Sequence, residues 1–167
     1  MSALLAVLVS GCGSLSRKPP PNINFTGVWR MDHEVSGNPA VLPGITAAAP
    51  RNAGPDPKGD APGDLLGELE SQVLRIDQRD GSTRIMYDSG QLHDYDWGRA
   101  VRGEASAGWQ KTYFVVRSPG PGGGELVRQF ILSDAGASLT VVTVFNKTGI
   151  TQFYKLDKQE TRRFFGE

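Results

Sequence analysis

Short segments in which apolar and polar residues alternate follow one another along most of the chain. Clusters of Gly, Pro, Asn and Asp separate them, as at Asp80-Gly81 and at Asn146–Gly149. Alternation with a period of two is typical of strands with one buried face, and the intervening residue types favour turns. The pattern predicts strands at Asn24–Asp32, Leu74–Asp77, Thr83–Tyr87, Gln91–Trp97, Ala100–Ala105, Trp109–Arg117, Leu126–Leu132, Leu139–Phe145 and Ile150–Leu156.

The connections between these strands are short, and no apolar segment of helical period separates them. Because parallel strands need crossover connections of a dozen or more residues, the pattern predicts an all-β antiparallel meander of about eight strands. Closing such a sheet into a barrel removes its exposed edges. The interior then either packs solid or holds one small molecule. A two-sheet β-sandwich is the alternative.

A long insertion interrupts the pattern after the first strand. Residues 36–63 contain six Pro and five Gly and show neither strand nor helix periodicity. Such a composition cannot bury enough apolar surface to offset its ordering entropy, so we expect a flexible segment. Asp64–Glu70 is expected to form a short helical turn. The polar residues 158–167, which follow the β domain at 24–157, are expected to form a C-terminal tail, either a final helical turn or a frayed end.

The composition narrows the function classes. The 167 residues carry 18 basic and 18 acidic side chains, so the net charge is zero and nucleic acid is not expected as a partner. One Cys excludes an internal disulfide, and only His33 and His93 are available for a His-built metal centre. The chain has the length of one ordinary domain that needs no metal or disulfide for stability.

The N-terminus carries a targeting signal. Ala3–Val9 is an apolar run of seven residues, about 10 Å as a helix, which is too short to span a bilayer but has the length of the apolar region of a signal peptide. Residues 9–12, Val-Ser-Gly-Cys, resemble the lipobox of bacterial lipoproteins. The resemblance implies that residues 1–11 are a signal peptide and that Cys12 is lipidated, which anchors the chain in a membrane. No Lys or Arg precedes the run, which favours a translation start further upstream.

The residues after Cys12 indicate how the anchor is used. Residues 12–23 include Pro19-Pro20-Pro21, which favours an extended tether between bilayer and domain. The residue after Cys12 is Gly13, whereas lipoproteins retained in the inner membrane are associated with Asp at this position. The resemblance therefore implies the cell envelope, on the periplasm-facing side of the outer membrane.

The first predicted strand carries Gly27 and Trp29 in a Gly-x-Trp arrangement. This motif, with the order of strands over residues 24–157, resembles lipocalins and related calycin barrels. The resemblance implies a lipocalin-like barrel in which Trp29 closes one end and a basic side chain from beyond the last strand packs on it. Three residues are candidates for that basic side chain: Lys155, Lys158 and Arg162.

The most suggestive polar cluster is His93-Asp94-Tyr95-Asp96, with Asp88 nearby. On a strand, His93 and Tyr95 face one side and the two carboxylates the other. The carboxylates are candidate ligands for a hard cation and His93 a candidate base, but a polar edge with solvated charges is the favoured interpretation.

Other polar segments lack the pattern of a catalytic site. Asp32-His33-Glu34 marks the entry into a loop, and no Ser lies in a Gly-x-Ser-x-Gly turn. Ser118–Gly124 is rich in Gly but lacks the Lys-Ser/Thr of a phosphate loop. We therefore expect no catalytic residues, no metal, no cofactor and no enzymatic activity.

Two functions fit these observations. The first is a lipid-anchored envelope lipoprotein whose barrel binds a small apolar or lipid-like molecule between aromatic and aliphatic walls with few charges. The second is a non-enzymatic structural or accessory lipoprotein that acts through an envelope protein partner. They differ in whether the barrel interior is filled.

Overall fold

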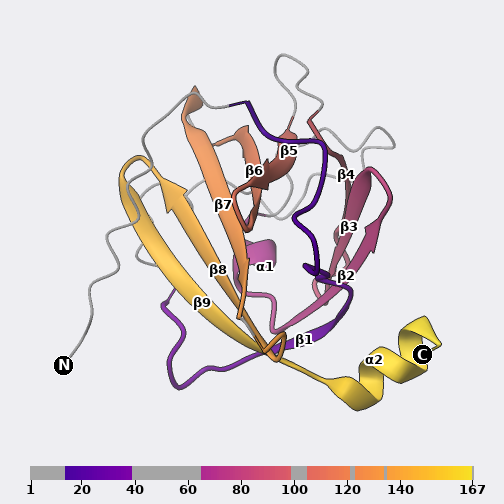
Figure 1. Cartoon of the computed structure of the whole chain (residues 1–167). Coiled ribbons are helices and arrows are strands. Elements are labelled where there is room, and N and C mark those ends of the chain that lie inside the picture. The colour runs from indigo at the N-terminus through magenta and orange to yellow at the C-terminus, as the bar shows by residue number, and fades with distance from the viewer. Residues whose placement is uncertain (1–13, 39–64, 99–104, 121–122, 134, 167) are drawn as a thin grey trace.

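The computed structural model describes residues 14–38, 65–98, 105–120, 123–133 and 135–166. Within these ranges, nine antiparallel strands form one continuous sheet in the order β4-β3-β2-β1-β9-β8-β7-β6-β5 (Figure 1). The strands are β1 (Gly27–Met31), β2 (Val73–Arg79), β3 (Ser82–Tyr87), β4 (Leu92–Asp96), β5 (Ser106–Gln110), β6 (Tyr113–Pro119), β7 (Glu125–Leu132), β8 (Ser138–Phe145) and β9 (Thr148–Leu156).

Pairing of β1 with β9 joins the two ends of the meander and curls the sheet into a nearly closed barrel. The edge strands β4 and β5 meet at a seam, where Trp97 and Ala107 form an isolated parallel bridge and the Gly98 N–H donates to the Ala107 carbonyl over 2.6 Å. The predicted all-β meander and barrel are confirmed. Because the sheet is single, the two-sheet alternative is wrong.

The alternation in the sequence places one side of each strand in the barrel. On β8, Leu139, Val141, Thr143 and Phe145 are buried, while the residues that alternate with them are half-buried. An aromatic cluster fills much of the core: Phe25 stacks on Trp109 at 5.5 Å between ring centroids, and Trp97 meets Trp109 edge-on at 5.5 Å. The apolar face of the meander therefore forms the barrel core.

One predicted strand is two strands in the structure. The sequence pattern predicts a single strand over Trp109–Arg117, but β5 ends at Gln110 and β6 begins at Tyr113. The turn between them includes Lys111 with a φ of +56°, a conformation that residues other than Gly and Asn seldom adopt. Because Lys stands there instead of Gly or Asn, the sequence gives no sign of a turn at this position. The expected strand at Ala100–Ala105 falls almost entirely outside the described residues, and β5 begins just after it.

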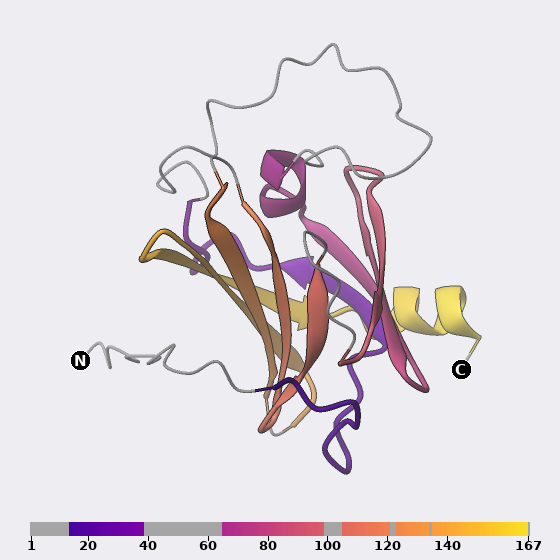
Figure 2. The same cartoon turned by 90° about the horizontal axis from the view of Figure 1, so that it is seen from above.

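Two short helices lie outside the sheet. The predicted turn near residues 64–70 is helix α1 (Leu65–Leu69), which lies over one end of the barrel (Figure 2). Its Leu69 packs with Leu126, Phe145 and Ile150. The predicted C-terminal tail contains helix α2 (Lys158–Phe165), which the Asp157 side chain caps by accepting from the Glu160 N–H.

The chain before β1 lies against the barrel. Ser16 bridges to Trp109, with the Ser16 N–H donating over 2.8 Å and the Ser16 carbonyl accepting over 3.0 Å. Figure 2 shows this N-terminal part of the described chain (14–26) at the end of the barrel opposite α1. The predicted tether at 12–23 thus includes residues paired with the barrel. Residues 1–13 and 39–64 lie outside the described residues, and the second range contains most of the predicted insertion at 36–63. At the start of this insertion the Gly37 N–H donates to the Thr151 carbonyl over 2.7 Å.

Neither described helix has the length and apolar character needed to span a membrane.

Candidate functional site

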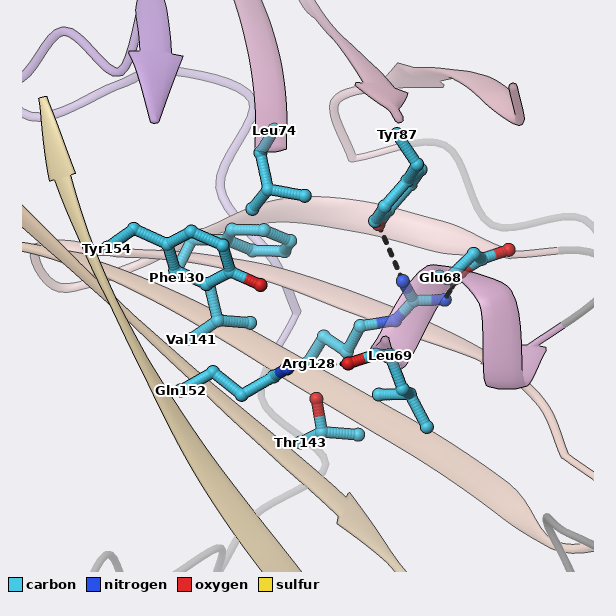
Figure 3. A pocket seen from close by; sticks show the side chains of 10 residues that line it. All are labelled: Glu68, Leu69, Leu74, Tyr87, Arg128, Phe130, Val141, Thr143, Gln152 and Tyr154. Carbon is cyan, nitrogen blue, oxygen red and sulfur yellow. Dashed lines mark hydrogen bonds and ion pairs between the residues drawn. The ribbon is translucent and has the colours of Figure 1, made fainter. Parts of the chain in front are cut away.

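The candidate site is a buried polar cluster inside the barrel, directly beneath α1 (Figure 3). Arg128 comes from β7, where the alternation places it on the same inward side as Phe130. Glu68 reaches it from α1, and Tyr87 and His93 come from the ends of β3 and β4. Side chains of α1 and β3 therefore contact the guanidinium directly, and His93 of β4 joins the cluster through Glu68.

The contacts within the cluster are close and charge-assisted. Arg128 Nη1 donates to the Tyr87 hydroxyl over 2.6 Å, and Arg128 forms an ion pair with the Glu68 carboxylate. Only 7% of the Arg128 side chain and 4% of the Glu68 side chain are exposed. The other Glu68 oxygen lies 2.8 Å from His93 Nε2, and the His93 ring stacks on Tyr95 at 5.7 Å.

The environment determines which of these groups are charged. Burial by itself raises the pKa of Glu68, but the charge of Arg128 and the hydrogen bond with His93 outweigh it, so the pKa lies below its ordinary value. Burial opposes the charge of Arg128, yet Tyr87 and Glu68 hold its pKa above the ordinary value. Burial raises the pKa of Tyr95 to about 12 and that of Tyr87 well above normal. At neutral pH the cluster is an Arg–Glu ion pair beside neutral tyrosines.

A small cavity lies between this cluster and the core. Its volume is about 10 Å³, close to the space of one water molecule. Two polar atoms of its lining residues, Arg128 Nε and Thr143 Oγ1, have no hydrogen-bond partner within the described part of the chain. The interior at this end is therefore filled by the protein's own side chains, Leu69 of α1 among them. Most of the lining is aromatic or aliphatic, and its two charged residues are Glu68 and Arg128.

Two inward-facing residues of β9 donate hydrogen bonds to backbone carbonyls next to α1. Gln152 Nε2 donates to the Leu69 carbonyl over 2.6 Å, and the Tyr154 hydroxyl donates to the Ser71 carbonyl over 3.3 Å. Both acceptors lie where α1 leads into β2. The helix is therefore held by two hydrogen bonds, the Glu68 ion pair and the packing of its leucine side chains.

The predicted polar cluster on β4 is divided between two environments. His93 and Tyr95 share one side of β4, as predicted, and this side faces the barrel interior, where His93 joins the Arg128 cluster. Asp94 faces outward, where Arg84 binds both its oxygens at 2.7 and 2.8 Å, so it is not a cation ligand. Asp88 instead accepts from the Gln72 and Val73 N–H groups. Among the described residues, no group of three or more His, Cys, Asp or Glu is placed to hold a metal ion.

Trp29 is buried in the core, and its Nε1 donates to the Phe25 carbonyl over 2.9 Å. Gly27 lies close to Leu156, and an added Cβ would lie 2.6 Å from Leu156 Cδ1, so a larger residue there would displace the Leu156 side chain. Of the basic residues expected to pack on Trp29, Lys155 pairs instead with Asp32 over 2.8 Å. Lys158 and Arg162 lie exposed on α2, and their packing on Trp29 stays a prediction.

The two remaining sequence candidates lie away from the cluster. His33 and Glu34 are exposed beyond β1, next to the Asp32–Lys155 pair. The described parts of the Ser118–Gly124 loop join β6 to β7.

Sequence reasoning missed Arg128 and Glu68, the two residues at the centre of the site. A signal existed for each. Arg128 occupies the position between Leu126 and Phe130 that shares their side of the strand, and Glu68 lies next to Leu69 and three residues after Leu65 in a helical turn. A charged residue at an apolar position of an amphipathic element indicates a buried charge.

No protein-family model and no curated protein matches this chain. Solved structures share its fold. A point mutant of the fluorescent protein UnaG is 15% identical with a TM-score of 0.50, over 80% of this chain and 96% of that one. Secretory abundant heat soluble protein 4 from Ramazzottius varieornatus is 12% identical with a TM-score of 0.50, over 79% of this chain and 94% of that one. At such identities the likeness concerns the fold alone.

Proposed function

We propose that this chain is a lipid-anchored envelope protein whose barrel binds an anionic amphipathic small molecule, with the acid group at Arg128 and the apolar part in the core. The observation that carries the proposal is the buried guanidinium of Arg128 under α1. Burying an ion pair costs several kcal/mol per ion, and apolar residues of similar volume often stabilise a core as well or better. An Arg retained there is better explained by a ligand than by stability.

Binding requires α1 to move, because the cavity of about 10 Å³ cannot hold an acyl chain. Glu68 is the carboxylate that now neutralises Arg128, and Leu69 is the apolar side chain that covers the core. A ligand with one acid group and an apolar chain offers the same two features. It can replace both contacts when α1 lifts, and the Tyr87 hydroxyl and Thr143 Oγ1 add hydrogen-bonding capacity near the acid group.

The anchor is proposed from the sequence. The Val-Ser-Gly-Cys segment after an apolar run supports acylation of Cys12, and through it a periplasm-facing position on the outer membrane. Binding rather than catalysis is proposed because the buried cluster consists of an ion pair and neutral tyrosines.

The binding test uses the full chain carrying Cys12→Ser, titrated with hexadecanoic acid and with hexadecanol, which has the same chain but no charge. We expect one saturable site that prefers the acid. Arg128→Met should weaken acid binding about 10- to 100-fold, the loss of a charged hydrogen bond, and leave the alcohol unchanged. Arg84→Met, which removes an outward-facing Arg of strand β3, is the matched control. Arg128→Lys keeps the charge if the Met variant does not fold.

The filled interior favours a second candidate, a structural envelope lipoprotein that acts through a protein partner. If neither ligand saturates the full chain, the binding proposal is wrong and this second function stands. Equal losses of acid and alcohol binding in Arg128→Met would show that Arg128 supports the fold rather than the ligand.

A further inference from the structure

The segment Ser14–Lys18, called the strap below, occupies the free edge of β5. Ser16 exchanges two backbone hydrogen bonds with Trp109, at 2.8 and 3.0 Å, in antiparallel register. The sheet's other edge, β4, reaches this region only through the bridge between Trp97 and Ala107. The strap thus provides the edge of β5 with hydrogen-bond partners that β4 does not supply.

Two glycines allow the strap to pack closely against the barrel at the β4–β5 seam. A Cβ on Gly108 would lie 2.8 Å from both Leu15 Cβ and the Ser16 carbonyl oxygen. A Cβ on Gly98, just beyond β4, would lie 2.3 Å from Arg17 Cγ. The strap therefore contacts both edge strands closely, which fixes its position on the barrel.

The direction of the strap determines which part of the barrel lies near residue 12. Because Ser16 is opposite Trp109 in antiparallel register, earlier residues of the strap run toward the β5–β6 turn at Lys111. Cys12 precedes Ser14 by two residues, a span of at most about 7 Å. An acyl chain on Cys12 would therefore hold this turn close to the bilayer, with no free spacer between them.

The strand registers place α1 at the opposite end of the barrel. The β5–β6 turn, the β7–β8 turn and the β2–β3 turn lie at one end, since Tyr113 pairs with Ile131 and Ser138 with Lys155. The β8–β9 turn lies at the other end, where α1 packs on Phe145 and Ile150. Figure 2 shows the strap and α1 at these opposite ends.

We infer that the strap end of the barrel rests on the lipid surface and that the α1 end, with Arg128, faces the aqueous phase. This inference rests on the proposed acylation of Cys12. Exposed Arg17, Lys18 and Lys111 at the strap end suit an anionic lipid surface. In this orientation a ligand enters the barrel from the aqueous side or from a soluble carrier, and not directly from the membrane that holds the anchor.

The test uses the acylated full chain in vesicles of phosphatidylethanolamine and phosphatidylglycerol. Acylation consumes the thiol of the chain's one Cys, so an engineered Cys can be labelled selectively. A fluorophore is placed at Thr112→Cys in the β5–β6 turn or, in a second protein, at Lys147→Cys in the β8–β9 turn, both exposed positions. Head-group nitroxide lipids should quench the first label several-fold more than the second. Equal or reversed quenching overturns the orientation.

Two controls test the lipid anchor and the strap separately. Flotation with vesicles in a density gradient tests the anchor: loss of flotation in Cys12→Ser supports it, and wild type that does not float overturns the anchor and the orientation with it. Ser16→Pro removes the N–H that bonds to Trp109, so flotation should persist while the quenching difference disappears. Ser14→Pro, two residues earlier, should keep the difference. A difference that survives Ser16→Pro overturns the role of the strap.

Discussion

Arg128 is a charged residue that the barrel buries in its interior. Its guanidinium is removed from water and balanced by Glu68, whose removal would leave an uncompensated charge in the core. Glu68→Gln should therefore lower the free energy of unfolding by about 3–5 kcal/mol, measured by denaturant titration. Glu70→Gln, an exposed neighbour, should change it by less than about 0.5 kcal/mol.

The double variant Glu68→Leu with Arg128→Met removes both charges and should recover most of that loss, because apolar pairs replace buried ion pairs well. A Glu68→Gln protein as stable as Glu70→Gln would show that the Arg128 charge is solvated and not buried.

The same carboxylate makes stability depend on pH on the acid side. The pKa of Glu68 in the folded chain lies below its ordinary value of 4.5, so its ionised form contributes fully above that pH. The contribution is lost as the pH falls through the lowered pKa. The stability difference between wild type and Glu68→Gln should therefore be constant from pH 7 to about pH 5 and shrink below it. A difference that stays constant down to pH 3 would contradict this assignment.

For single residues, the sequence predicted which side of a strand a side chain lies on better than it predicted which side chains it contacts. Alternation correctly placed His93 and Tyr95 on one side of β4 and Asp94 on the other. It could not show that Glu68 and Arg128 would meet His93, because those residues are 25 and 35 positions away and lie on other elements. A buried ion pair depends on the register of strands and the position of α1, which local patterns do not contain.

Among the elements, α2 was expected as a polar tail, either a helical turn or a frayed end, and a buried hydroxyl links it to the sheet. Thr161 Oγ1 accepts from the buried Val28 N–H over 2.9 Å and donates to the Asp157 carbonyl over 2.7 Å. The helix thereby provides a hydrogen-bond acceptor for the Val28 N–H, which does not pair with a neighbouring strand. Its polar composition concealed this role, because a single buried Thr in an exposed helix gives no periodic signal.

Thr161→Val keeps the shape of the side chain but leaves the Val28 N–H without a partner. We expect the free energy of unfolding to fall by about 1–3 kcal/mol, with Thr161→Ser closer to wild type. Thr112→Val in the exposed β5–β6 turn serves as the control for a Thr-to-Val change. If Thr161→Val unfolds like that control, water satisfies the β1 donor.

For the whole molecule, the sequence predicted the meander and the barrel because most turns after β2 are short and strands such as β3 and β8 alternate between buried and half-buried residues. It did not predict how the barrel is completed. The strap pairs with a strand more than 90 residues away, and its Pro-rich continuation indicated a free tether. Nor could it show that the interior is filled, since α1 supplies Leu69 and Glu68 to the space that a ligand would use.

The strap also predicts how a shortened chain should behave. A chain that begins at residue 22 lacks the partner of the Trp109 N–H and carbonyl, and uncovered edge strands pair readily with other chains. Hydrogen exchange at the Trp109 amide should rise strongly relative to a chain that begins at residue 14. The Gly108 amide, which points to β6 by strand alternation, should stay protected in both. Sedimentation should show that the shorter chain self-associates with rising concentration while the longer one stays monomeric. Equal exchange at Trp109 in the two chains would mean that the strap leaves the edge of β5 in solution, and the barrel would then be complete without it.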